Sequence, residues 1–299
     1  MKKVLITLGV VILLIVVGGV SYAYYLYHSV KSTANNIYEP VGNHTTSLSN
    51  KKPISILLMG VDERPNDRGR SDTLIYMTLN PKTNKMVMMS IPRDTRTEIA
   101  GRGTINKINA AYAYGGTEMA MNTVEKFLDV PVDYYIKMNM EGLSKLVDAV
   151  GGVTVYNNIS WHDEGYYKKG YYYKKGNIEL DGAKALGYVR MRHLDPRGDF
   201  GRNERQRDVI MAIVNKASSI SSVSRYNNIL DAIQGNVKTN LTFDEMKSIA
   251  ENYRGVKNNV ENYELKGQGT KINGIYYFIV GDQEKQKVHN MIMEQLGER

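Results

Sequence analysis

The sequence of 299 residues contains no cysteine, which excludes disulfide bonds and thiolate chemistry. Its five histidines are scattered without the spacing of a zinc site, and the HExxH pattern of metalloproteases is absent. A GxSxG nucleophile elbow and a GxxxxGK[ST] phosphate loop are also absent, and Gly267 and Gly269 do not extend to GxGxxG. Among the chemistries considered, only phosphate chemistry has a positive signal in the sequence.

Arginine and aspartate recur together in three short segments, residues 59–73, 90–95 and 188–207. Arginine keeps its charge and can donate to two phosphate oxygens at once. Carboxylates repel phosphate, but they bind Mg²⁺, which phosphate also binds. Because both charges recur beside apolar runs, the sequence predicts a site for a metal-bound phosphate or pyrophosphate.

Residues 4–20 form an uncharged apolar run that continues to about Tyr27. This is long enough to cross a bilayer, which takes roughly 20 residues. Lysines precede the run and tyrosines follow it, which favours a single-pass anchor in the cell membrane with its N-terminus inside. The alternative is a signal peptide cleaved near residues 21–23, but the run is long for one. We therefore predict that residues 1–27 are a cytoplasmic stub and transmembrane signal anchor.

Residues 28–52 are polar, lack apolar periodicity and are predicted to be a linker. Residues 53–299 are predicted to form one extracytoplasmic domain, long enough to bury a substantial core. The chain has 39 Lys and Arg against 31 Asp and Glu, which suits anionic partners such as phosphate polymers or lipid head groups. The basic segment GRNERQR raises the alternative of a membrane-anchored DNA-binding regulator. The predicted topology argues against a nucleic-acid partner.

Helix and strand patterns alternate from residue 54 onward. Apolar runs predict a strand at Ile54–Val61 and a hairpin of Thr73–Leu79 with Met86–Ile91, joined by NPKTNK. Further strands are predicted at Asp133–Met140, Val153–Tyr156 and Gly274–Val280. Helices are predicted at residues 106–114, 117–128, 142–150, 204–217, 243–253 and 283–296. This alternation predicts an α/β/α sandwich around a mixed central β-sheet, preceded by one transmembrane helix.

The third Arg/Asp segment allows two interpretations. Arg190 and Arg192 would share one face of a strand but diverge on a helix, and their neighbours favour a strand or an irregular segment. Arg202 and Gln206 would share a face at the start of a helix, where the N-terminus favours phosphate. The alternative is that this charged run forms surface salt bridges.

Asp62 and Asp72 flank predicted strands and are the best candidates for metal ligands. Mg²⁺ takes one or two carboxylates and completes its coordination with phosphate and water. Residues 166–176, YYKKGYYYKKG, are interpreted either as a contact for a polymer, a glycan or the membrane, or as an exposed hairpin with solvated lysines. The hairpin is favoured because loops tolerate this composition without a ligand.

Several long motifs stand in one fixed order between about Ile54 and about Ala217. They are ISILLMGVDER, GRSDTLIYMTLNPKTNKMVMMSIPRDT, KINAAYAYGG, VDAVGGVTV and LGYVRMRH…GDFGRNERQR. Together with the N-terminal anchor, they resemble the LytR–CpsA–Psr family of bacterial envelope proteins, and most of all its teichoic-acid-transferring members from bacilli.

The resemblance implies an α/β/α sandwich that holds a polyprenyl pyrophosphate with its tail in an apolar channel. It implies a phosphotransferase that moves an anionic glycopolymer, wall teichoic acid, from this carrier to a muramic acid hydroxyl of peptidoglycan. The implied cofactor is Mg²⁺, with Mn²⁺ as an alternative. Other interpretations are hydrolysis of the lipid pyrophosphate, and a non-catalytic polyprenyl-phosphate-binding scaffold or regulator of the envelope.

The resemblance also assigns residues. Arg93, Asp62 and Asp72 are expected to be catalytic, and the two aspartates are expected to hold the metal. The residues expected to bind the pyrophosphate are Arg93, Arg190, Arg192, Arg202, Asp199 and Gln206. The general base is left unassigned, and the segment after residue 220 carries no motif from which a role can be transferred.

Overall fold

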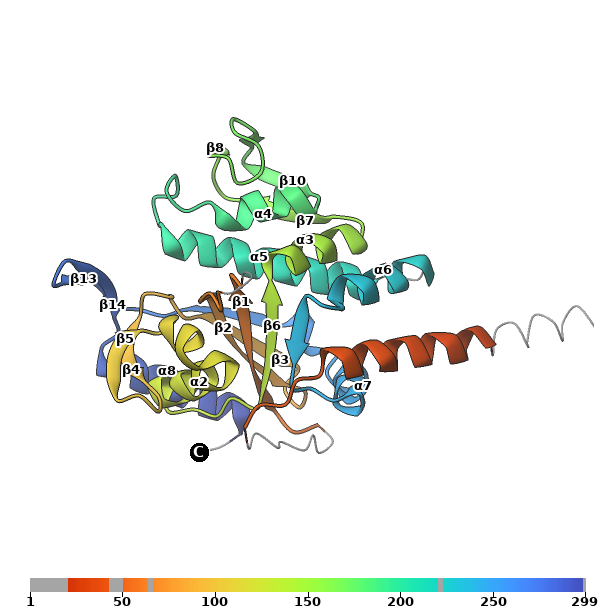
Figure 1. Cartoon of the computed structure of the whole chain (residues 1–299), viewed down its shortest axis with the longest axis horizontal. Helices are drawn as coiled ribbons and strands as arrows, with labels where there is room; N and C mark the ends of the chain where they lie inside the picture. Colours follow the sequence, from red (N-terminus) through yellow and green to blue (C-terminus); the bar gives the residue numbers. More distant parts are fainter. Residues whose placement is uncertain (1–20, 43–50, 64–66, 220–222, 298–299) are drawn as a thin grey trace, which may run out of the picture.

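A six-stranded sheet forms the centre of the molecule (Figure 1). From edge to edge its strands are β11 (Val237–Thr239), β6 (Tyr134–Asn139), β1 (Ile54–Val61), β2 (Ser71–Asn80), β3 (Lys85–Ser90) and β12 (Val260–Glu264). β1 pairs antiparallel with β2 and parallel with β6, while β3 pairs antiparallel with β2 and parallel with β12. The structure is a computed structural model that describes residues 21–42, 51–63, 67–219 and 223–297.

Helices cover both faces of this sheet, as the sequence predicts. On one face, α2 (Ala110–Leu128) and α8 (Asp282–Leu296) pack against β1 and β2 through a core that includes Met59, Tyr76, Met121 and Ile292. On the other face lie α5 (Asp199–Ser218) and α7 (Phe243–Asn252). Because both faces are covered, nearly every residue of β2 is buried, which explains its almost unbroken apolar run.

A second core lies beyond the end of the sheet, in the upper part of Figure 1. There α3 (Met140–Ala149), α4 (Gly182–Arg190) and the strand pair β7 (Val153–Asn157) and β10 (Gly176–Leu180) pack against α5. The short strands β8 (Trp161–His162) and β9 (Tyr172–Tyr173) pair with each other, and β9 lies within the tyrosine- and lysine-rich residues 166–176. α6 (Val223–Ile233) lies against α3.

Two hairpins and a short turn of helix complete the fold. β4 (Arg96–Ile99) pairs with β5 (Thr104–Lys107), and β13 (Gln268–Ile272) pairs with β14 (Ile275–Ile279). The 3₁₀ turn is η1 (Val256–Asn258). The β13–β14 hairpin projects beside the β4–β5 hairpin (Figure 1), and the amide of Phe278 donates to the carbonyl of Asp94 at 2.9 Å.

Three predicted elements differ from the structure. The expected helix at 106–114 begins only at Ala110, because the chain up to Lys107 pairs with β4. The backbone then leaves helical geometry at Gly115 and Gly116, where Gly116 has φ 68°. The predicted helices at 106–114 and 117–128 therefore meet at this kink within α2.

The expected linker at residues 28–52 is helical up to residue 37, in a helix that occupies residues 21–37 of the described chain. Ala34, Ile37 and Val41 are buried, at a spacing hidden among polar residues. The predicted linker is therefore helical over residues 28–37. Among the described residues no helix is both long and apolar enough to cross a membrane, and the predicted span at 4–20 lies outside them.

Candidate active site

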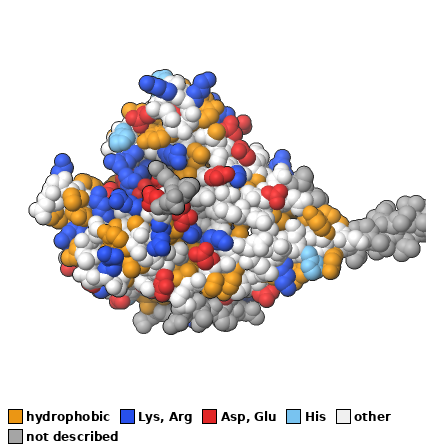
Figure 2. Space-filling model, viewed as in Figure 1, with side chains coloured by type: hydrophobic (Ala, Val, Ile, Leu, Met, Phe, Trp, Pro, Cys, Tyr) orange, Lys and Arg blue, Asp and Glu red, His pale blue; other side chains and the backbone are white. Residues whose placement is uncertain are grey.

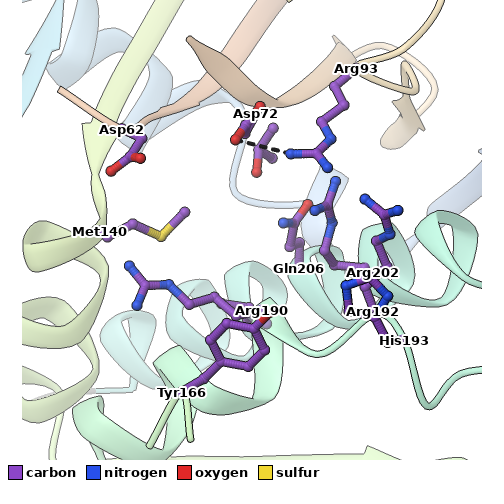
Figure 3. Close-up of a pocket in the computed structure, with 12 residues that line it drawn as sticks. Asp62, Asp72, Arg93, Met140, Tyr166, Arg190, Arg192, His193, Arg202 and Gln206 are labelled. Carbon is purple, nitrogen blue, oxygen red and sulfur yellow. Dashed lines mark ion pairs between the residues drawn. The ribbon is translucent and has the colours of Figure 1, made fainter. Parts of the chain in front are cut away.

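A cavity of about 390 Å³ opens where the ends of β1 and β2 face α4 and α5. Figure 2 shows Lys and Arg side chains gathered around a hollow on this face. The sheet side contributes Asp62, Asp72 and Arg93 (Figure 3). The helix side contributes the other lining residues that the sequence singled out: Arg190, Arg192, Arg202 and Gln206. Side chains from all three Arg/Asp segments therefore meet at one cavity.

The sheet-side residues sit at strand ends. Asp62 directly follows β1, Asp72 is the second residue of β2, and Arg93 follows β3 in a tight turn. The turn is held by the Thr95 hydroxyl, which donates to the Pro92 carbonyl at 2.6 Å. The turn is also held by the backbone N–H of Asn109, which donates to the Arg93 carbonyl at 3.3 Å. The ends of β1, β2 and β3 thus present these side chains at the same end of the sheet.

Arg190 and Arg192 do not lie on a strand, and of the two expected conformations the irregular segment is correct for Met191 and Arg192. Arg190 is the last residue of α4, and the buried Met191 leaves helical geometry with φ −57° and ψ 130°. The chain turns at Met191, and both arginines still line the same cavity.

Arg205 holds this turn in place. Its guanidinium donates to the carbonyls of Tyr188 at 3.2 Å and Met191 at 2.6 Å, and it pairs with Asp195 at 2.6 Å. Both side chains of the pair are 6% exposed. A buried arginine outside the predicted set therefore positions two of its members.

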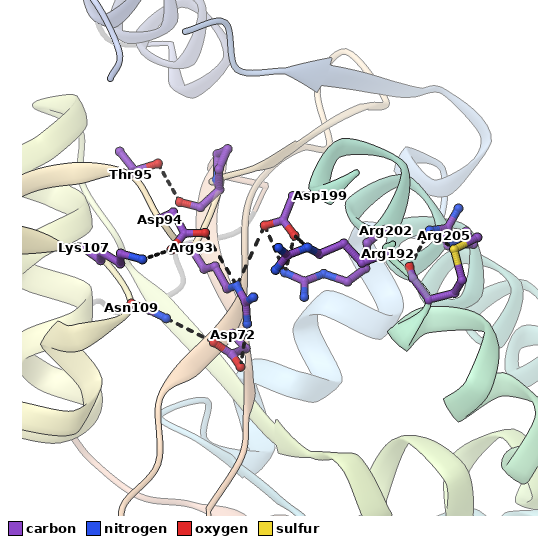
Figure 4. A network of polar contacts seen from close by, with 12 residues as sticks. Asp72, Arg93, Asp94, Thr95, Lys107, Asn109, Arg192, Asp199, Arg202 and Arg205 are labelled. Atoms are coloured by element: carbon purple, nitrogen blue, oxygen red, sulfur yellow. Dashed lines mark hydrogen bonds and ion pairs between the residues drawn. The ribbon is translucent and has the colours of Figure 1, made fainter. Parts of the chain in front are cut away.

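Asp199 joins three of the cavity arginines (Figure 4). Its carboxylate lies 3.1 Å from Arg202, 3.5 Å from Arg192 and 3.9 Å from Arg93. Arg93 also pairs with Asp72 at 3.1 Å. A second Asp72 oxygen accepts from the Asn109 side chain at 3.1 Å. The network preorganises the guanidinium groups before any ligand binds.

Burial and charge act differently on two of these arginines. Burial opposes the charged form of Arg93, but Asp72, Asp199 and Asp94 outweigh it and raise its pKa above the ordinary value. Burial lowers the pKa of Arg202, Asp199 opposes this, and the neighbouring Arg93 lowers it further. Arginine stays protonated even so, and Arg202 therefore carries a charge that an added anion would stabilise.

Several polar atoms at the cavity have no hydrogen bond among the described residues. Nε of Arg93 and Nε of Arg202 are buried donors without an acceptor in hydrogen-bond range, and the side-chain carbonyl of Gln206 is a buried acceptor without a donor. The side chain of Arg190 makes no hydrogen bond or ion pair within the described ranges. Buried donors without acceptors are costly, and an oxyanion in the cavity would satisfy the arginines.

Asp62 and Asp72 are the carboxylates that line this cavity. Within the described ranges, no group of three or more His, Cys, Asp or Glu is placed to hold a metal ion. Two carboxylates are nevertheless a set that suits Mg²⁺ when phosphate supplies further oxygens. Asp72 is paired with Arg93 in the structure, so it would have to share its carboxylate between the two cations.

An apolar cavity of about 220 Å³ adjoins the charged one. Its walls include Leu58, Ile136, Leu143, Ile210 and Ile213. The residues common to both cavities are Thr73, Met140, Val189 and Gln206. The site therefore has a polar compartment and an apolar compartment side by side, as an amphipathic phospholipid requires.

Tyr166 and His193 are among the lining residues that were not predicted as site residues. Tyr166 belongs to the segment interpreted as a solvated hairpin, yet it lines the charged cavity. Its loop is held by Asp163, whose carboxylate accepts from the amides of Tyr167 and Lys168, both at 2.8 Å. His193 follows Arg192 and also lines the cavity. The recurrence of tyrosine and lysine was the only sequence signal for Tyr166.

Known proteins resemble the chain over nearly its full length. The polyisoprenyl-teichoic acid–peptidoglycan teichoic acid transferase TagU of Bacillus subtilis (strain 168) is 48% identical over 300 residues, which cover 99% of this chain and 96% of that protein. The crystal structure of B. subtilis TagU matches with a TM-score of 0.68 at 47% identity, covering 83% of this chain and 99% of that one.

A more distant solved structure is TagT bound to LIIa-WTA. It has a TM-score of 0.71 at 30% identity and covers 86% of this chain and 97% of that one. The LytR_cpsA_psr family model matches residues 24–294, which include every residue of both cavities. The sequence motifs, the convergent arginines and these matches agree, and the chain belongs to the LytR_cpsA_psr family, the LytR–CpsA–Psr family.

Proposed function

We propose that this protein is a phosphotransferase that moves an anionic glycopolymer of the wall teichoic acid class from a polyprenyl pyrophosphate carrier to peptidoglycan. The observation that carries the proposal is the meeting of four arginines and two aspartates at one cavity that adjoins an apolar one. The names of relatives at 48% identity support the same activity.

The two compartments match the two parts of the carrier. The diphosphate would lie among Arg93, Arg190 and Arg202, which have buried or unpaired donors. The first part of the polyprenyl chain would enter the apolar cavity between α3 and α5, where Leu143 and Ile213 lie. Burial of hydrocarbon there contributes roughly 0.8 kcal/mol per CH₂ group, so the tail would also add affinity.

The transfer forms one P–O bond and breaks another. The acceptor hydroxyl oxygen bonds to the phosphorus that carries the polymer, and the bond from that phosphorus to the bridging oxygen breaks. Polyprenyl monophosphate leaves with the electron pair, and the hydroxyl proton passes to a base that we leave unassigned. Arg93, Arg190 and Arg202 would stabilise the negative charge that develops on the bridging and non-bridging oxygens.

Asp62 and Asp72 would hold Mg²⁺, or Mn²⁺ in its place, and this ion would add positive charge at the phosphates. The residues themselves orient the diphosphate through the Asp72–Arg93 and Asp199–Arg202 pairs. We also propose that residues 1–27 anchor the chain in the cell membrane with the N-terminus inside, which would place the apolar cavity near its lipid substrate.

The proposal is tested with the purified full chain, a labelled lipid-linked teichoic acid precursor, peptidoglycan and Mg²⁺. Label should become covalently attached to peptidoglycan, and Arg93→Ala should abolish most of this transfer. Arg254→Ala is the matched control, because that exposed guanidinium lies just after α7, and its one hydrogen bond within the described part of the chain goes to the carbonyl of Ala250. Release of free polymer at the same rate with and without peptidoglycan would indicate a hydrolase instead.

A further inference from the structure

A third cavity, of about 330 Å³, adjoins the charged cavity at Arg192, whereas the apolar cavity adjoins it at Met140, and Figure 3 shows these two residues on opposite sides of the charged cavity. The third cavity shares Arg192 with the charged cavity, and it shares no lining residue with the apolar one. Arg192 and Asp199 form the wall between it and the proposed diphosphate position. The charged cavity is therefore the middle compartment of three.

The order of the compartments fits the geometry of phosphoryl transfer. In an in-line displacement, the attacking oxygen approaches the phosphorus opposite the leaving oxygen. The leaving group here is the polyprenyl phosphate, whose tail occupies the apolar side. The attacking hydroxyl must then arrive from the opposite side, where the third cavity lies. The polymer stays bonded to the phosphorus and extends to one side of this line.

The walls of the third cavity combine aromatic and charged groups. Tyr276 on β14 is 46% exposed and lines it. Phe200 and Phe278 pack edge to face at 5.6 Å between ring centroids in its floor. The carboxylates of Asp94 and Asp199 also line it. An aromatic face beside fixed carboxylates suits a sugar ring, which has an apolar face and several hydroxyl donors.

The third cavity is held by several contacts to the turn that carries Arg93. Asp94 directly follows Arg93, pairs with Lys107 at 2.6 Å and accepts at its carbonyl from the Phe278 amide at 2.9 Å. The Tyr276 hydroxyl lies across Gly269, where a Cβ would come within 2.6 Å of it. The β13–β14 hairpin thus fixes the tyrosine ring relative to Arg93.

From these observations we infer that the third cavity is the subsite for the acceptor, the hexose ring of a peptidoglycan glycan strand that carries the attacking hydroxyl, with Tyr276 as its stacking surface. The inference rests on the proposed function for the identity of the acceptor. It gives a role to a hairpin in the segment after residue 220, for which the motifs supplied none.

The test measures transfer by the full chain as the concentration of each substrate is varied separately. The acceptor is a soluble, uncrosslinked strand of alternating N-acetylglucosamine and N-acetylmuramic acid. Tyr276→Ala should raise the KM for this strand roughly tenfold or more, because loss of a central aromatic contact typically costs that much, and leave the KM for the lipid-linked donor unchanged. Tyr276→Phe keeps the ring and should restore most of the loss.

Ile275→Ala is the matched control, because Ile275 is an exposed neighbour on the same strand and does not line the cavity. A KM for the strand that does not change in Tyr276→Ala would overturn the inference. A rise in the donor KM alone would also overturn it and would assign the cavity to the sugar of the donor.

Binding of the same strand is measured by calorimetry without donor, so that the subsite is judged separately from turnover. If the wild-type chain transfers no polymer, the proposed function fails. Weaker strand binding by Tyr276→Ala than by wild type would still support a glycan subsite, and equal binding by the two would overturn it.

Discussion

At the scale of single residues, the arginines in and beside the cavity differ in how many protein partners they have. Arg205, beside the cavity, donates to two carbonyls and pairs with Asp195, and Arg93 pairs with Asp72 and Asp199. Arg190 has no ion pair or hydrogen bond with the described part of the chain. Their substitution should therefore affect stability and ligand binding in different proportions.

Arg205→Ala should destabilise the fold, because it removes the buried cation that pairs with Asp195 and the donor to the carbonyls of Tyr188 and Met191. Removing one member of a buried pair costs about 3–5 kcal/mol. Urea unfolding of wild type and variant measures the change in the free energy of unfolding. A change below about 0.5 kcal/mol would contradict the role of Arg205 in holding the 188–195 segment.

Arg190→Ala should weaken ligand binding and leave the stability of the fold nearly unchanged. Among the described residues the side chain has no partner to lose, so the free energy of unfolding should stay within about 0.5 kcal/mol of wild type. Affinity for a polyprenyl diphosphate should fall at least tenfold, because a hydrogen bond to a charged group contributes about 1.5–3 kcal/mol. Equal affinity of the two proteins in a direct binding assay would remove Arg190 from the diphosphate site.

At the scale of elements, α5 serves two compartments. Arg202 and Gln206 are one turn apart and line the charged cavity, and Ile210, Ile213 and Val214 continue along the helix into the apolar one. The spacing in the sequence predicted the shared face of Arg202 and Gln206. It could not tell an apolar cavity wall from an apolar core, because the same side chains serve either purpose.

Ile213→Trp should narrow the apolar cavity and weaken binding of a long-chain polyprenyl diphosphate by roughly tenfold. A diphosphate with a very short chain should bind as it does to wild type, since it reaches only the charged compartment. Competition binding with the two chain lengths separates these effects. An equal loss for both ligands would place the damage at the arginines instead.

α5 also carries a destabilising carboxyl. Burial and, after it, the nearby Glu204 raise the pKa of Asp208 to about 6 from an ordinary 3.8. Its folded-state pKa is raised, so the unfolded chain releases the proton first and stability should fall as pH rises between about 4 and 6. Asp208→Asn should remove this part of the slope and increase stability at pH 7. Thermal unfolding of both proteins across pH 4–7 measures it, and identical slopes would contradict the shift.

At the scale of the whole molecule, the site depends on segments far apart in the chain. The sequence motifs predicted Asp62, Asp72, Arg93, Arg190 and Arg202 as site residues, and all five line one cavity. The sequence left the backbone around Arg190 open as a strand or an irregular segment, and it missed the helix that ends at Arg190. Tertiary contacts made by Arg205 decide that question.

Other features had no local signal. Tyr276 reaches the arginine cluster through the pairing of its hairpin and the contact between Phe278 and Asp94. The helix over residues 21–37 buries Ala34 and Ile37 near its end, among polar residues that conceal them in the sequence. Both depend on which distant surfaces meet, which neither periodicity nor composition specifies.

The most direct measurement is a crystal structure of the protein with a polyprenyl diphosphate. The predicted result is density for the two phosphates within hydrogen-bonding distance of Arg93, Arg190 and Arg202, with the hydrocarbon chain leaving past Leu143 and Ile213. Phosphates bound on another face, or a chain that avoids the apolar cavity, would contradict the shared diphosphate site on which the proposed transfer depends.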